Sequence, residues 1–331
     1  MNNFPPVKRI RLSKHQGTRG ADIDAIELAV HEAGTGPAVV MCHGFPELAY
    51  SWHHQLKAIS EGGFRAIVPD MRGYGNSDCP AAIEDYDLEH LTADLVALLD
   101  ALDIEKAVFA GHDWGGFVAW AMPVLYPDRT LGVIGVNTPN FPVPTTPIYR
   151  SLVDEDDKIY NLWFQKPGVA ESFLDKRTRM VFEKLMRSGV SPEQAMAQAE
   201  RDGIDFNPFM NIEAMGLIGE DLLTPEEMDY YIDVYQKAGF RGGINWYRNI
   251  DRNAERLPKV GTTKLHLPSL MITAEWDPAL TPALAAGMPD ICSDLEMHMI
   301  EKCGHWTQQE KPIELNRLML DWLKRRFGKT G

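Results

Sequence analysis

Short apolar runs alternate along this chain with segments whose apolar residues recur every three to four positions. The helical segments include residues 91–102, whose leucines fall on one face, and residues 314–327. Seven apolar runs have the length of strands buried on both faces: residues 26–31, 38–42, 65–68, 107–110, 131–136, 269–273 and 296–300. This alternation predicts an α/β fold with a mostly parallel sheet.

The alternation stops in the middle of the chain. Residues 137–147 hold four prolines, and proline cannot donate the hydrogen bonds that a central strand needs. Helical patterning then continues to about residue 256, and strand patterning resumes near Leu267. We therefore predict a core of residues 1–142 and 257–331, interrupted by a helical cap of residues 143–256, with a small-molecule site between the sheet and the cap.

The composition is that of a folded protein, with 44% hydrophobic and 24% charged residues among 331. The net charge of 33 − 47 = −14 disfavours nucleic acid and anionic membranes, because both would be repelled. No apolar stretch is long enough for a membrane span, and the N-terminus lacks the apolar segment of a secretory signal. The four cysteines form no CxxC pair, so we expect free thiols in the cytoplasm. The sequence leaves the oligomeric state open between a monomer and a homodimer.

The turn after the predicted strand 107–110 carries the first candidate for chemistry. Gly111-His112-Asp113-Trp114-Gly115 has the spacing of the nucleophile elbow, G-x-S-x-G, with Asp113 in the serine position. The flanking glycines permit a tight turn that lifts the central side chain into a cleft. Taken alone, an Asp between glycines is more often a turn residue or a helix N-cap.

Two further residues favour the catalytic interpretation of this turn. Asp277 and His305 each follow a predicted strand, so the chain order is nucleophile, acid and histidine, as in the α/β-hydrolase fold. Glu275 is the second choice for the acid. The loop after the strand at 131–136, where an acid stands in some arrangements, offers Asn137 and Asn140 instead. We therefore expect Asp277 to be the partner of His305.

A carboxylate nucleophile restricts the reaction. Attack on an ester or amide carbonyl would give an anhydride, whereas attack on an sp³ carbon, in an epoxide or an alkyl halide, gives an ester that base-activated water hydrolyses. That hydrolysis passes through an oxyanion, for which we expect the backbone N–H groups of Phe45 and Trp114 to be the donors. The chain has no H-E-x-x-H motif, and the adjacent His53 and His54 point to different faces. We expect neither a metal nor another cofactor.

Several motifs together resemble the epoxide hydrolases of the α/β-hydrolase superfamily that use an aspartate nucleophile, of the soluble and microsomal type. They span about residues 38–310 and are His43-Gly44-Phe45-Pro46-Glu47, Tyr50-Ser51-Trp52, Asp70-Met71-Arg72-Gly73-Tyr74-Gly75, Gly111-His112-Asp113-Trp114-Gly115-Gly116, Phe164-Gln165-Lys166-Pro167-Gly168-Val169-Ala170-Glu171, Asn245-Trp246-Tyr247-Arg248-Asn249 and Cys303-Gly304-His305-Trp306-Thr307-Gln308. The resemblance implies an eight-stranded, mostly parallel sheet flanked by helices, with an inserted cap. It also implies conversion of an epoxide and water to a vicinal diol, through an ester on Asp113 that is hydrolysed by water activated by His305 and Asp277.

The cap motifs of this resemblance indicate the leaving group. Epoxide hydrolases of this type hold the epoxide oxygen with two cap tyrosines, which Tyr160 and Tyr247 match in this chain. A phenol donates a hydrogen bond to the oxygen as the C–O bond breaks, which a halide leaving group does not need. Trp52 and Trp163 are expected to contact the substrate.

Two other functions remain as alternatives. Haloalkane and haloacid dehalogenases share the aspartate nucleophile and the histidine base. The first type usually has Asn or Glu where Phe45 stands, and the second typically has Arg where Trp114 stands. A ligand-binding protein without catalysis on the same scaffold would have no need of Asp113, Asp277 and His305 together.

Overall fold

The computed structural model describes residues 4–142, 144–203 and 207–328. In this part of the chain, eight strands form one sheet in the order β1-β4-β6-β5-β7-β8-β9-β10, and β2 and β3 form a small hairpin. The pairs β1–β4 and β4–β6 are antiparallel, and the other neighbours are parallel. The strands are β1 (Lys8–Leu12), β2 (His15–Gln16), β3 (Asp22–Ile23), β4 (Ile26–Ala33), β5 (Ala38–Cys42), β6 (Arg65–Pro69), β7 (Ala107–His112), β8 (Thr130–Val136), β9 (Ser269–Ala274) and β10 (Leu295–Ile300).

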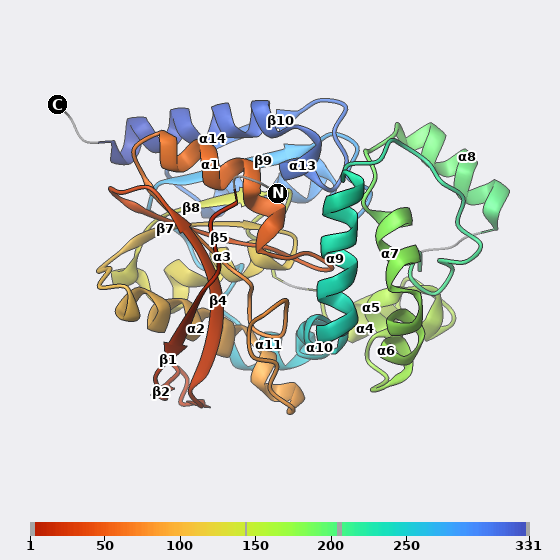
Figure 1. The fold of residues 1–331 in the computed structure, drawn as a ribbon, viewed down its shortest axis with the longest axis horizontal. Coiled ribbons are helices and arrows are strands. Elements are labelled where there is room, and N and C mark those ends of the chain that lie inside the picture. The colour runs from red at the N-terminus through yellow and green to blue at the C-terminus, as the bar shows by residue number, and fades with distance from the viewer. Residues whose placement is uncertain (1–3, 143, 204–206, 329–331) are drawn as a thin grey trace.

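Helices cover both faces of the sheet (Figure 1). On one face α1 (His53–Glu61) packs with α14 (Pro312–Phe327), and on the other α2 (Leu88–Ala101) packs with α3 (Trp114–Leu125). Alternate side chains of each central strand enter the two core clusters, for example Val39 below α1 and Val40 on the side of α2. Because both faces are buried, β5, β7 and β9 are apolar along nearly their whole length.

Helices fill the chain between β8 and β9 and gather on one side of the molecule (Figure 1). They are α4 (Thr146–Arg150), α5 (Tyr160–Trp163), α6 (Val169–Leu174), α7 (Thr178–Leu185), α8 (Pro192–Asp202), α9 (Pro225–Ala238), α10 (Arg241–Arg248) and α11 (Ile250–Arg256). Ser191 and Thr224 start two of them with capping boxes, in which side chain and backbone satisfy each other's hydrogen bonds. Two short helices, α12 (Met288–Ile291) and α13 (Thr307–Glu310), flank β10.

The structure confirms the predicted α/β-hydrolase fold and its eight-stranded, mostly parallel sheet. The seven predicted strands agree with the observed ones to within two residues at each end. The pattern missed β1, because Lys8, Arg9 and Arg11 lie on an exposed, antiparallel edge strand and mask its period of two. Residue 143, where we placed the start of the cap, lies outside the described residues.

Among the residues described, no helix combines the length and the apolar character needed to cross a membrane.

Candidate active site

Asp113 sits on the sharp turn between β7 and α3. Its backbone has φ 50° and ψ −125°, a conformation that an aspartate adopts only when the surroundings enforce it. Gly111 and Gly115 make the turn possible, since a Cβ on Gly111 would overlap the Gly115 carbonyl. The Asp113 carbonyl accepts hydrogen bonds from Gly116 N–H at 3.0 Å and from Thr138 Oγ1 at 2.7 Å. The elbow predicted from the sequence is therefore present.

The two carboxylate oxygens of Asp113 have different surroundings. Oδ1 accepts the backbone N–H of Phe45 at 2.8 Å, and the N–H of Trp114 also bonds to the carboxylate. Burial raises the pKa of Asp113, and the neighbouring His305 and the two N–H donors oppose this shift only in part. Of the two donors predicted for an oxyanion, Phe45 thus holds Oδ1, and Trp114 contacts the same carboxylate.

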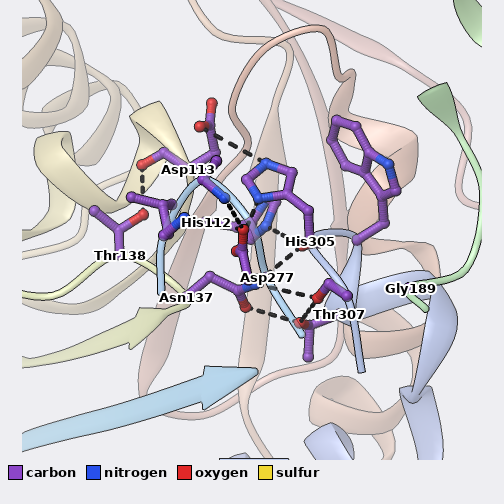
Figure 2. Close-up of polar contacts among 12 residues, drawn as sticks. His112, Asp113, Asn137, Thr138, Gly189, Asp277, His305 and Thr307 are labelled. Atoms are coloured by element: carbon purple, nitrogen blue, oxygen red, sulfur yellow. Dashed lines mark hydrogen bonds and ion pairs between the residues drawn. The ribbon is translucent and has the colours of Figure 1, made fainter. Parts of the chain in front are cut away.

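His305 lies between two carboxylates, with Asp113 on one side and Asp277 on the other (Figure 2). Its Nδ1 is 2.9 Å from Asp277 Oδ2, and its Nε2 is 3.8 Å from Asp113 Oδ2. Burial alone would lower the pKa of His305, but the charges of Asp277 and Asp113 outweigh burial and raise it to about 9. The imidazole is therefore held in one orientation, with Nε2 directed at Asp113.

Asp277 is the acid that the fold brings to His305. Burial would raise its pKa, but the charge of His305 and hydrogen bonds from it and from the Leu280 N–H lower the pKa far below its usual range. Glu275, the second choice, is exposed, and its carboxylate accepts the N–H of Lys302 instead. The sequence ranking of the two carboxylates matches their positions.

Asn137 is a member of the site to which the sequence analysis gave no role. Its Nδ2 donates to Asp277 Oδ2 at 2.6 Å and to the His305 carbonyl at 3.1 Å. Its Oδ1 accepts Thr307 Oγ1 at 2.7 Å (Figure 2). The signal was available, because Asn137 directly follows the strand β8, at the edge of the sheet where the other site residues lie.

A buried pair of side chains, His112 and Glu47, lies next to the elbow. His112 Nδ1 is 3.0 Å from Glu47 Oε2, and both side chains are fully buried. His112 Nε2 faces the His305 carbonyl at 2.7 Å, so the ring bridges Glu47 and the loop of His305. Burial would raise the pKa of Glu47, but the charge of His112 lowers it to about 2. Glu47 also accepts the Gly44 N–H of its own loop at 2.6 Å and Gln308 Nε2 at 3.0 Å, so it connects the loop after β5 to the segment that follows His305.

Tyr160 and Tyr247 lie next to each other, close enough to Asp113 for its charge to act on both phenols. Their ring centroids are 5.8 Å apart, and Tyr247 also packs edge-on against Phe45 at 5.5 Å and Trp114 at 5.0 Å. Burial raises the pKa of both phenols far above the usual value, and the Asp113 charge raises each further. Both phenols therefore keep their protons and are available as hydrogen-bond donors beside the carboxylate.

The structure separates the two predicted substrate-contacting tryptophans. Trp163 is buried near this group and packs against Phe164 and Phe173. Trp52 is fully buried in the core cluster between the sheet, α1 and α14, and among the described residues it makes none of the ring contacts that surround Tyr247. Its position supports packing rather than contact with a substrate.

The described ranges contain no group of three or more His, Cys, Asp or Glu side chains that could hold a metal ion. The expectation that the protein works without a metal or cofactor stays a prediction.

Comparison with known proteins identifies the family. The sequence model of the alpha/beta hydrolase fold matches residues 37–312. The chain is 40% identical over 318 residues to epoxide hydrolase A of Mycobacterium tuberculosis, and this match covers 92% of the chain and 96% of that protein. The chain belongs to the epoxide hydrolase family of α/β hydrolases.

Other epoxide hydrolases extend this relationship. Bifunctional epoxide hydrolase 2 of Sus scrofa is 38% identical over 300 residues, which are 90% of this chain and 53% of that protein, so the chain spans about half the length of this relative. The crystal structure of epoxide hydrolase A from Mycobacterium thermoresistibile superposes with a TM-score of 0.84 at 37% identity, and the match covers 96% of this chain and 98% of that one. The fold and the family prediction are thus both confirmed.

Proposed function

We propose that the protein hydrolyses epoxides to vicinal diols, with Asp113 as nucleophile, His305 as general base and Asp277 as the residue that orients His305. The observation that carries this proposal is the placement of two protonated phenols, Tyr160 and Tyr247, beside the partly buried Asp113 carboxylate on its strained elbow. The family relationship adds weight, because proteins named epoxide hydrolases match nearly the whole chain.

In the first half-reaction Oδ2 of Asp113 attacks an epoxide carbon. The new bond is an ester, the C–O bond of the ring breaks, and the released oxygen takes a proton donated by Tyr160 or Tyr247. Oδ2 suits this role because Oδ1 is already occupied by the Phe45 N–H. Ring opening places charge on the oxygen that faces the phenols, so their hydrogen bonds strengthen as the reaction proceeds.

In the second half-reaction water attacks the Asp113 carboxyl carbon. Nε2 of His305 takes a proton from this water, and Asp277 stabilises the cation that forms. The carbonyl oxygen Oδ1 gains charge and stays bound to the Phe45 N–H, and the nearby Trp114 N–H is the second donor for this oxyanion. When the intermediate collapses, the diol leaves with Oδ2 and takes the proton from His305. The Asp113 carboxyl group, which now holds one oxygen from water, releases the second proton of that water, and this proton returns to the tyrosine that donated one in the first half-reaction.

The same Asp and His could serve a dehalogenase, and the surroundings of Asp113 favour the epoxide. A halide leaves as a stable anion and gains little from two phenols whose raised pKa keeps them protonated. Phe45 and Trp114 occupy the positions where the two types of dehalogenase have other residues, and the family relationship is to epoxide hydrolases.

The deciding experiment compares substrates on the intact chain. We expect diol formation from an aryl epoxide such as styrene oxide and no halide release from 1-chlorobutane, with the Asp113→Ala variant inactive on both. Halide release without diol formation would replace the proposal with dehalogenation. Binding of the epoxide without turnover by the wild-type protein would replace it with a ligand-binding role.

The remaining expectations follow from the same proposal. Residues 143–256 act as a cap that carries the two tyrosine donors over the core. The partner is a small epoxide, with no role for nucleic acid or membrane. The four cysteines are free thiols in the structure, which supports a cytoplasmic location. A sedimentation experiment would distinguish a homodimer from a monomer.

A further inference from the structure

A segment between α7 and α8 reaches across to the loop that carries His305. Figure 2 shows Gly189 of this segment beside the loop of His305 and Thr307. The carboxylate oxygen Oε2 of Glu310 accepts the N–H of Gly304 at 2.8 Å and the N–H of Gly189 at 3.1 Å. A single side chain therefore bonds to the backbone next to His305 and to the backbone of the helical region at the same time.

The two backbones are also in direct contact. A Cβ built on Gly189 would overlap the Cα and N of Gly304, and a Cβ on Gly304 would overlap the Cα and N of Gly189. Neither position therefore accepts a side chain without displacing the other segment. A few residues away, Nε1 of Trp306, which follows His305, donates to the Leu185 carbonyl at the end of α7.

On the other side, the segment with Gly189 is fixed to the chain that leads into α9. The Ser188 N–H donates to the Glu220 carbonyl at 2.9 Å, and the Leu222 N–H donates to the Met186 carbonyl at 3.2 Å. Between these bonds Arg187 forms a β-bridge and an ion pair with Asp221. The segment is thus braced within the helical region and provides a fixed support for the His305 loop.

We propose that Glu310 and the Gly189–Gly304 contact form a positioning element that holds His305 for ester hydrolysis. This inference rests on the proposed function. Gly304 precedes His305 in the chain, so a displacement of Gly304 moves the imidazole relative to the Asp113 carboxyl carbon. Asp113 itself is held by a different set of contacts, from Phe45 and Thr138, and its attack on the epoxide needs no base.

The two half-reactions should therefore respond differently to a change at this contact. In Glu310→Ala we expect ester hydrolysis to slow by about ten-fold, the scale of a sub-ångström misplacement of a catalytic group. Formation of the ester should change by less than about two-fold, so the fraction of enzyme carrying the ester should rise at steady state. Rapid quench followed by intact-mass measurement gives this fraction and both rates. A loss of folded enzyme would lower the ester fraction instead.

Three further variants complete the test. Glu310→Gln keeps an oxygen that can accept both N–H groups and should restore ester hydrolysis to near the wild-type rate. Gly189→Ala disturbs the same contact from the helical side with Glu310 intact and should also accumulate ester. Glu301→Ala removes an exposed glutamate of the turn before Cys303 and should leave both rates unchanged.

The outcomes separate this inference from the proposed function. If Glu310→Ala and Gly189→Ala form and hydrolyse the ester at wild-type rates, or if both steps slow equally, the positioning role is wrong while the epoxide hydrolase stands. If the wild-type protein forms no ester with any epoxide, the proposed function itself has failed.

Discussion

His305 Nε2 lies 3.8 Å from Asp113 Oδ2, beyond hydrogen-bond distance, while Oδ1 of the same carboxylate accepts the Phe45 N–H at 2.8 Å. The base is therefore close to the nucleophile without being bonded to it. Because Oδ2 is not tied to His305, it is available to attack a carbon. Because Nε2 is directed at the same group, it can activate a water for attack on the ester that results.

Replacing His305 should separate the two half-reactions. In His305→Gln the nucleophile keeps its N–H donors. We therefore expect about one equivalent of epoxide to be consumed in a burst, as the ester on Asp113 forms, and no turnover after that. Intact mass should rise by the mass of one epoxide. A folded His305→Gln enzyme that forms no adduct would show that His305 is needed before the ester forms.

Oxygen labelling tests the covalent route independently of any variant. In a single turnover in heavy-oxygen water, the diol should carry an Asp113 oxygen and no label from solvent, because Oδ2 leaves with the product. Label should then be found in the Asp113 carboxylate by peptide mass spectrometry. A first-turnover diol fully labelled from solvent would contradict attack by Asp113 and indicate direct attack by water.

The two phenols should share one role. Tyr160→Phe and Tyr247→Phe should each slow ester formation by up to the ~10²–10⁴-fold expected of general acid help, and the double variant should be nearly inactive. The single effects need not add, since both groups act on one oxygen. Tyr230→Phe is the control, because Tyr230 lies on α9 and its ring packs against Tyr50 rather than against this pair. Equal losses in ester hydrolysis would argue against donation to the epoxide oxygen.

Ester hydrolysis should speed up as pH rises. It needs neutral His305, whose pKa in the free enzyme is raised to about 9 by the charges of Asp277 and Asp113, against the effect of burial. Esterification removes the Asp113 charge, so the pKa of His305 should fall below 9 in the intermediate. The rate of ester decay in single turnovers, measured between about pH 6 and 10, should therefore have its midpoint at a lower pH than the titration of His305 in the free enzyme, measured by NMR. A midpoint at or above the free-enzyme value would contradict this coupling.

The buried pair of Glu47 and His112 should contribute strongly to folding stability. Glu47→Gln removes the carboxylate that faces His112 in a fully buried site, which costs about 3–5 kcal/mol when one partner of such a pair is lost. Urea denaturation should show this loss in the free energy of unfolding. Glu301→Gln, an exposed glutamate, should change it by less than about 0.5 kcal/mol. A loss of similar size in both variants would show that the buried pair is not special.

The sequence by itself determined seven of the eight strands of the sheet and the three residues that follow them. The strand β5 and the runs that became β7 and β9 are apolar along nearly their whole length because both faces of a central strand are buried. Since parallel strands end at the same edge, the order of Asp113, Asp277 and His305 already indicated one site. The choice of Asp277 over Glu275 also followed from position, two residues further beyond the strand.

Only the tertiary structure decided which residues support that site. Asn137 bonds to Asp277 across 140 positions of sequence, and Glu47 bonds to His112 across 65 positions. Glu310 likewise touches Gly189 from a distant part of the chain. A local pattern reports which face of an element is buried, but such contacts depend on how loops from different strands and the helical region come together. The packing of α1 on the sheet is such a contact. It places Trp52 in the core, although the sequence predicted that Trp52 contacts the substrate.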